Sequence, residues 1–294
     1  MVAKLYNWND VGAPSLGTSN DGSLFSILRA CLVDGYGTRT SAGWTMPYSD
    51  LPTKRGIFKP VTSSVHLFLD DNYNYQFARV RGCDSAIDID TLIGVFPTED
   101  ELLGNPANNL LVSKRYSTST SNNTWHLIAD DEWFYFITER DTRTFPGGFF
   151  FGKIDHADSN FGKPYLITGI LSATDQPSIG NFPYSIFQSA NGYWFVQDNY
   201  FQIGVADQVD EEGLTRSYVN PNPISGKIEV GKLELHRSTT PYIRHGRRPN
   251  LSRSLGLSCV VYFSGDKVVF NAKKYLISRY GTLLFFIEYD VEVG

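Results

Sequence analysis

Two clusters of acidic residues are the side chains in this sequence whose types could do chemistry most directly. Asp130, Asp131 and Glu132 stand between two apolar runs, and Asp70 and Asp71 stand between two others. Two carboxylates about 5–9 Å apart across a groove can hydrolyse a glycosidic bond, one as the acid and one as the nucleophile or base. Tight turns also favour Asp, because its side chain hydrogen-bonds nearby backbone N–H groups. We expect the turn role for both clusters and keep glycan cleavage as the alternative.

Metal and cofactor chemistry has weaker signals. Asp155, His156 and Asp158 could supply metal ligands at short range, but a metal site requires further ligands that converge from elsewhere in the chain. The sequence contains no phosphate-binding loop, no glycine fingerprint for dinucleotides, no His-Glu-x-x-His motif and no nucleophile elbow. We therefore expect a solvated loop at 155–158, no metal, no cofactor and no enzymatic activity.

Positive charge is concentrated in residues 236–253, in a chain whose formal net charge is −5. Such a basic segment can bind nucleic acid, remain a solvated loop, or pair with an acidic patch on a neighbouring subunit. We favour the subunit contact, because the Arg guanidinium forms bidentate, geometry-fixing hydrogen bonds with carboxylates. The candidates for this interface, in an expected exposed loop, are Arg244, Arg247, Arg248 and Arg253.

The composition predicts a folded, soluble, β-rich protein. Of the 294 residues, 41% are hydrophobic and 19% are charged, as is typical of a globular chain. Aromatic residues reach 14%, and the 26 Gly and 14 Pro favour turns between strands. The negative net charge argues against nucleic-acid binding, and neither a membrane-length apolar run nor a secretory signal is present, so we expect no membrane partner. Cys31, Cys83 and Cys259 are far apart, and we expect three reduced thiols.

One stretch has the apolar spacing of an α-helix, at residues 24–34. Asp21 or Ser23 could cap its N-terminus, and Gly35 stands where a residue with positive φ ends a helix. The helix is too short to be stable alone, so its apolar face must pack on the strands that follow. The residues of that face are Leu24, Ile27, Leu28, Cys31 and Leu32.

A loop rich in aromatic residues follows this helix at 43–48. Trp44 and Tyr48 flank Pro47, and large aromatic side chains next to a turn most often pack against the body of a protein. We therefore take Trp44 and Tyr48 as candidates for anchoring this loop by packing.

The rest of the chain shows apolar runs at the spacing of β-hairpins. The strongest signal is a hairpin with strands at 125–129 and 133–137, and another has Asn191-Gly192 as its turn. About a dozen strands of this kind predict a mainly β fold, an antiparallel β-sandwich or barrel with one short N-terminal α-helix. We expect residues 1–55 to form an arm, helix and Trp44 loop packed on a β-rich body at 56–294, with a candidate subdivision near 174–183.

Short motifs that match those of one protein family occur in the same order along most of the chain. The sequence departs from the family pattern near Arg244: the family has Arg-Gly-x-x-Pro-Gly there, and in this chain His245 and the Arg247-Arg248 pair interrupt it. The matching residues are Ala13-Pro14, Leu16, Gly22-Ser23-Leu24, Ala30-Cys31-Leu32-Val33, Gly35-Tyr36-Gly37, Ala42-Gly43-Trp44-Thr45, Ala78-Arg79-Val80-Arg81-Gly82, Ala129-Asp130-Asp131-Glu132-Trp133-Phe134-Tyr135, Pro221-Asn222-Pro223, Arg244, Gly246 and Pro249.

This order of motifs resembles a family of structural proteins in the virions of tailed bacteriophages. The resemblance implies a subunit made in the bacterial host cytoplasm and located in the virion, in the tail, neck or baseplate. It implies that the partners are copies of the chain and other virion structural proteins, and it carries over no catalytic residue. The alternative function is a glycan-binding or glycan-cleaving tail module.

Overall fold

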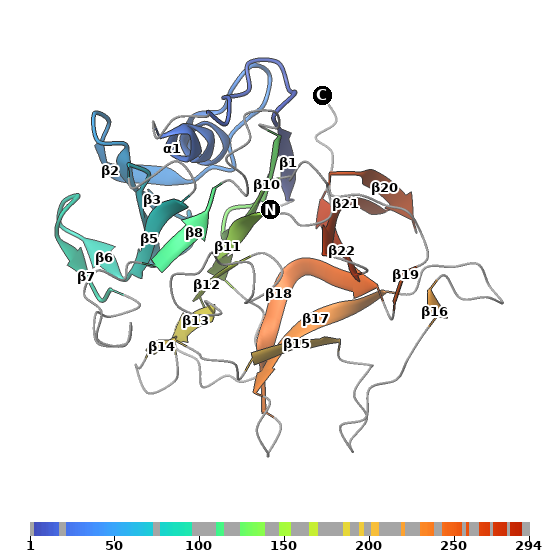
Figure 1. Ribbon diagram of the computed structural model, residues 1–294. Coiled ribbons are helices and arrows are strands. Elements are labelled where there is room, and N and C mark those ends of the chain that lie inside the picture. The colour runs from blue at the N-terminus through green and yellow to red at the C-terminus, as the bar shows by residue number, and fades with distance from the viewer. Residues whose placement is uncertain are drawn as a thin grey trace.

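Strands predominate in the computed structural model, and one short helical segment lies near the N-terminus of the part that it describes (Figure 1). No helix in that part is long and apolar enough to span a bilayer. The structure describes residues 3–17, 22–72, 77–95, 110–114, 124–138, 147–153, 165–169, 185–188, 194–196, 201–205, 219–220, 230–237, 243–254, 257–258, 265–270, 273–280 and 283–289.

The first sheet has five antiparallel strands in the order β2-β3-β4-β5-β8. The expected loop at 43–48 is wrong in its second half, because β2 begins at Thr45. Pro47 is tolerated there because β2 is an edge strand and its ladder with β3 shifts register between Thr45 and Tyr48. The strands are β2 (Thr45–Asp50), β3 (Arg55–Lys59), β4 (His66–Asp70), β5 (Phe77–Cys83) and β8 (Leu110–Ser113). A small hairpin lies between the last two in sequence, with β6 (Ser85–Ala86) and β7 (Leu92–Ile93).

The second sheet has seven antiparallel strands, and the hairpin predicted at 125–137 lies within it. Every residue of β9 and of β10 is buried, so these strands are covered on both faces, as their continuous apolar sequences indicate. The N-terminal arm contributes the edge strand β1, which pairs with β9. In sheet order the strands are β1 (Lys4–Asn7), β9 (Trp125–Ala129), β10 (Trp133–Thr138), β11 (Gly147–Lys153), β12 (Tyr165–Gly169), β13 (Ser185–Gln188) and β14 (Trp194–Val196).

One hydrophobic cluster joins these two sheets and the helical segment. Aromatic rings pack edge-to-face within it, with ring centroids 5.3 Å apart for Phe134 and Phe149 and 5.7 Å apart for Trp44 and Phe134. Gly148 has φ +122°, and a Cβ there would lie 2.0 Å from the carbonyl oxygen of Phe136 on the paired strand. A side chain at position 148 would therefore force the two strands apart.

The predicted helix is confirmed in its place and its buried face, but its geometry differs. It begins as α1 (Ser23–Leu28) and continues as a π-helix, η1 (Arg29–Asp34). The carbonyl groups of its last turn have no partner within the helix and bond the chain that follows: Cys31 accepts a hydrogen bond from the N–H of Ala42 and Leu32 from that of Trp44, each at 2.9 Å. Gly35 has the expected positive φ, 81°. All five residues of the predicted apolar face are fully buried: Leu24, Ile27, Leu28, Cys31 and Leu32.

The N-cap of this helix differs from the prediction, because Ser23 is the first residue of α1, while Asp21 lies outside the described residues. Gly22 occupies the N-cap position with φ 73°, and no side chain there accepts a hydrogen bond. The acceptor comes from a distant turn instead: Oδ2 of Asp71 receives the N–H of Phe25 at 2.9 Å. A carboxylate supplied by the tertiary structure satisfies the exposed N–H groups that a local cap would otherwise satisfy.

A third sheet is formed by the C-terminal part of the chain. Its order is β15-β17-β18-β22-β21-β20, and all neighbouring strands are antiparallel. The strands are β15 (Phe201–Val205), β17 (Val230–Arg237), β18 (Ile243–Ser254), β20 (Lys267–Phe270), β21 (Lys273–Tyr280) and β22 (Leu283–Tyr289), beside a short parallel pair, β16 (Val219–Asn220) and β19 (Leu257–Ser258).

These sheets confirm the predicted mainly β, antiparallel fold with one short helix. The arrangement is sandwich-like, and the described strands do not close into a barrel. Residues 1–55 supply edge strands to two of the sheets, since β1 pairs with β9 and β2 pairs with β3. The candidate subdivision at 174–183 and Cys259 lie outside the described residues, whereas Cys31 and Cys83 are buried free thiols.

Candidate functional site

A row of alternating charges crosses the outer face of the five-stranded sheet. Strand pairing places Asp50 opposite Arg55, Arg55 opposite Asp70, and Asp70 opposite Arg79. Residues directly opposite each other share a face of a sheet, and neighbours along a strand lie on opposite faces. Leu69 belongs to the hydrophobic core, so Asp70 and the rest of the row lie on the face away from that core.

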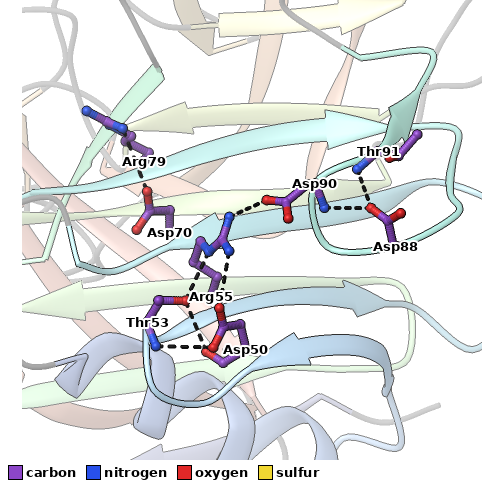
Figure 2. A network of polar contacts seen from close by, with 8 residues as sticks. All are labelled: Asp50, Thr53, Arg55, Asp70, Arg79, Asp88, Asp90 and Thr91. Carbon is purple, nitrogen blue, oxygen red and sulfur yellow. Dashed lines mark hydrogen bonds and ion pairs between the residues drawn. The ribbon is translucent and has the colours of Figure 1, made fainter.

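Arg55 is the centre of this row (Figure 2). Its Nη2 lies 3.2 Å from Oδ2 of Asp50, its Nε donates to Oγ1 of Thr53 at 3.0 Å, and its Nη1 donates to Oδ1 of Asp90. Hydrogen bonds from Thr53 and then from Arg55 hold the pKa of Asp50 below its usual value. The bond to Asp90 connects the sheet to the β6–β7 hairpin, so Arg55 holds that hairpin against the sheet.

The tip of the β6–β7 hairpin is ordered by its own hydrogen bonds. Oδ1 of Asp88 accepts the N–H groups of Asp90 at 2.9 Å and of Thr91 at 2.7 Å, and these bonds, that of Asp90 first, lower the pKa of Asp88. The N–H of Ile87 donates to the carbonyl of Thr91 at 3.0 Å. Figure 2 shows this turn beside the charge row. The hairpin is thus fixed at its tip by Asp88 and at its side by Arg55.

This fixed hairpin presents apolar side chains to solvent. Ser85 pairs with Ile93, and Ile87 hydrogen-bonds Thr91, so these four residues share one face of the hairpin. The side chains of Ile87 and Ile93 are 61% and 48% exposed. Two exposed isoleucines on one face of an ordered hairpin, next to the carboxyl groups of Asp88 and Asp90, are suited to contact with another protein rather than to bond-making chemistry.

The arginines predicted as an exposed interface loop lie in a strand instead. Arg244, Arg247, Arg248 and Arg253 all fall within β18, which pairs with β17 and β22. The ladder shifts register between Lys232, which faces Ser252, and Glu234, which faces Arg247, so residues 248–251 form a bulge. This bulge accommodates Pro249 inside a strand and explains why the segment has the composition of a loop. The proposed role of the arginines as an interface remains a prediction.

The two aromatic anchor candidates differ in their environment. Trp44 is 2% exposed, and its Nε1 donates to the carbonyl of Asp130 at 2.6 Å. Its ring also packs against Phe134 and Phe151, so the predicted packing role is confirmed for Trp44. Tyr48 is half-buried in β2, opposite Ile57 of β3.

The acidic cluster between β9 and β10 forms the predicted turn. Oδ1 of Asp130 accepts the N–H groups of Glu132 at 2.8 Å and of Trp133 at 2.9 Å. The Glu132 carboxylate binds Nζ of Lys153 at 2.8 Å and Oγ1 of Thr62 at 2.7 Å. Burial raises the pKa of Asp130 to about 6, against the effect of its two N–H donors. These contacts give both carboxyl groups a role in the fold.

One ionic contact was not anticipated from the sequence. Asp71 and Lys114 form an ion pair with side chains 0% and 1% exposed, and Nζ of Lys114 also donates to the carbonyl of Asp71 at 3.1 Å. Burial raises the pKa of Asp71, while Lys114 and the N–H groups of Phe25 and Leu24 act in the opposite direction. No local pattern connects residues that are 43 positions apart. By contrast, Asp50 and Arg55 flank a short turn, and reading β2 and β3 as a hairpin would have placed them opposite each other.

The part of the chain that is described holds no group of three or more His, Cys, Asp or Glu residues placed to bind a metal ion. The predicted solvated loop at 155–158 lies outside that part. No protein-family model matches the chain, and no curated protein matches it.

Proposed function

We propose that the chain is a structural subunit of a tailed-bacteriophage virion, in the tail, neck or baseplate, where it contacts copies of itself and other virion proteins. The observation that supports a contact function is the braced β6–β7 hairpin, which exposes Ile87 and Ile93 on one face. A surface that is ordered before binding loses little conformational entropy when a partner covers it. The Arg55–Asp90 and Asp88 contacts supply that order.

The virion location rests on the sequence motifs, and the structure explains what those motifs do. Leu16, Leu24 and Trp44 are all buried in the common core, and Gly35 and Gly37 have positive φ. These residues determine packing and turns rather than reactivity. A resemblance based on them supports a shared fold and a shared place in the particle, without implying a shared reaction.

A particle-incorporation experiment tests this proposal. A phage that lacks the gene for this chain is complemented with a tagged copy, and gold-labelled antibody against the tag is located on purified particles by negative-stain microscopy. We expect label at one position on the tail, neck or baseplate. Particles that assemble, infect and carry no label would contradict the proposal.

A matched pair of variants tests the contact surface in the same experiment. Ile87→Lys with Ile93→Lys replaces two exposed side chains of the hairpin, and Val269→Lys replaces one that is 67% exposed on β20. We expect the hairpin variant to incorporate poorly and the β20 variant to incorporate normally. Equal incorporation of the two variants would exclude the hairpin as a particle contact.

Glycan cleavage, the alternative function, is tested on the purified protein by release of reducing ends from host polysaccharide. The acidic turn offers it little support, because the Asp130 carboxylate is bonded to two backbone N–H groups and Glu132 to Lys153 and Thr62. We expect no release. Release that Asp131→Asn abolishes would establish the alternative instead.

A further inference from the structure

Charge is separated along this chain into one acidic and one basic segment. Residues 82–113 contain no Lys, Arg or His, and residues 235–265 contain no Asp or Glu. The acidic residues of the first segment are Asp84, Asp88, Asp90, Glu99, Asp100 and Glu101, and the arginines of the second are Arg237, Arg244, Arg247, Arg248 and Arg253. Such separation creates two local fields of opposite sign on a single chain.

The acidic residues of this segment that the structure describes, Asp84, Asp88 and Asp90, lie in or next to the β6–β7 hairpin. Asp88 is bonded to two backbone N–H groups that favour its ionised form, so the tip of the hairpin carries negative charge at neutral pH. The face with Ile87 and Ile93 adds apolar surface beside that charge. A partner that fits this surface must therefore bring positive charge together with area that can cover two isoleucines.

The arginines of the basic segment lie in β17 and β18. Arg247 faces Glu234 across the ladder, whereas Arg253 faces Gly231 on one side and Phe285 on the other. Arg248 falls in the bulge at 248–251. The register thus places a glutamate directly opposite Arg247 and no acidic residue directly opposite Arg253 in these two ladders. Figure 1 shows β18 in a different sheet from the β6–β7 hairpin, which lies at the left margin of the view.

We infer that the β6–β7 hairpin of one copy binds the basic segment at β18 of a second copy. This inference rests on the proposed function and names the partner of the same site. Opposite charges on the two segments steer the copies together, and burial of Ile87 and Ile93 retains them. The contact joins two different surfaces, so it is head-to-tail, and repeating it produces a ring or a filament rather than a closed two-fold dimer.

Sedimentation velocity on the purified full chain tests the association itself. We expect species larger than a monomer at about 50 mM NaCl that dissociate at about 500 mM NaCl, because exposed charges are screened at high ionic strength. The variant Ile87→Lys with Ile93→Lys should sediment as a monomer, and the control Val269→Lys should sediment as the wild type does. A wild-type chain that is monomeric at both salt concentrations would overturn the inference.

The head-to-tail geometry makes a sharper prediction for mixtures. The hairpin variant keeps an intact basic segment, and Arg248→Glu with Arg253→Glu keeps an intact hairpin. Arg247 is left in place because a carboxylate there would face Glu234. Each variant alone should be monomeric, while their mixture should form a dimer and nothing larger. A mixture that stays monomeric would overturn the inference.

A third measurement keeps the inference testable if the arginine variant does not fold, as judged by circular dichroism. The hairpin variant is then added to the wild-type chain, where it should end each growing assembly and shorten it. Wild-type assemblies of unchanged size would overturn the inference. A chain that is monomeric in solution yet present in particles would overturn the inference and leave the proposed function intact. A chain that associates in solution yet is absent from particles would contradict the proposed function and leave the association intact.

Discussion

Asp70 and Asp71 are neighbours in sequence, yet they belong to two regions with different physics. Asp70 lies in the outer charge row, 17% exposed, with its Oδ2 3.8 Å from Nη1 of Arg79. Asp71 is 0% exposed on the inner side, paired with Lys114 and bonded to the N–H of Phe25. One step along the chain therefore separates a partly exposed ion pair from a buried one.

The difference between these two pairs shows which charges are committed to the fold. An exposed pair contributes little to stability, because water solvates either partner nearly as well. A buried pair has lost that solvation, so removing one partner leaves the other charge without compensation. We therefore expect the inner pair to be required for folding and the outer row to remain available for contact with another protein.

The largest effect is expected on the inner side, at Leu28. Leu28→Asp should lower the free energy of unfolding by about 5 kcal/mol, because it removes buried apolar contacts and places a carboxylate among them. Leu28 is fully buried in the core below the five-stranded sheet. Chemical denaturation measures the loss, with Leu28→Met as the control, expected within about 1.5 kcal/mol of the wild type. A near-wild-type midpoint for Leu28→Asp would mean that the helix face is not buried.

The next effect concerns the buried pair itself. Lys114→Met should cost about 3–5 kcal/mol, because it leaves the Asp71 carboxylate buried without its cation. Adding Asp71→Asn should recover much of that loss, since an amide carries no charge and its oxygen can still accept the N–H of Phe25. Urea denaturation of the single and double variants measures both quantities. A double variant no more stable than Lys114→Met would show that the charge is not the cause.

A smaller, pH-dependent effect is expected at Asp130. Its folded-state pKa of about 6 exceeds the unfolded value of about 3.9. Between these values the folded state binds more protons, so this group's contribution to stability is lost as pH rises from about 4 to about 6. The unfolding free energy of the wild type minus that of Asp130→Asn should therefore fall across this window. Denaturation curves at several pH values test this, and a difference that rises with pH would contradict the assigned pKa.

The smallest effect is expected in the outer row. Arg55→Gln should change the melting temperature by no more than about 2 °C, because its ion pairs are partly exposed. The same change removes the bond to Asp90, so amide hydrogen exchange should accelerate in the β6–β7 hairpin. A large decrease in melting temperature would show that the outer row is required for folding, as is expected of the buried pair. It would remove the contrast between the two regions.

Periodicity was enough to predict the elements whose packing follows directly from the sequence. The spacing of Leu24, Leu28 and Cys31 predicted the buried helix face, and the hairpin predicted at 125–129 and 133–137 is formed by β9 and β10. The loop predictions were less accurate. The loop expected to carry Arg244, Arg247, Arg248 and Arg253 is a bulged strand, and the loop expected at 43–48 contains the start of an edge strand. Bulges and edges relax the pairing that Pro otherwise prevents, and only the neighbouring strands reveal them.

The candidate site was less accessible from the sequence than the fold. The sequence by itself determined the mainly β class, the one short helix, its apolar face and the separation of acidic from basic segments, because these follow from local composition and spacing. Only the tertiary structure decided that Arg55 reaches Asp90, that Lys114 pairs with Asp71, and that Asp71 caps α1. The physical reason is that burial and ion pairing depend on which layers meet in space, and that meeting joins residues 35 to 46 positions apart.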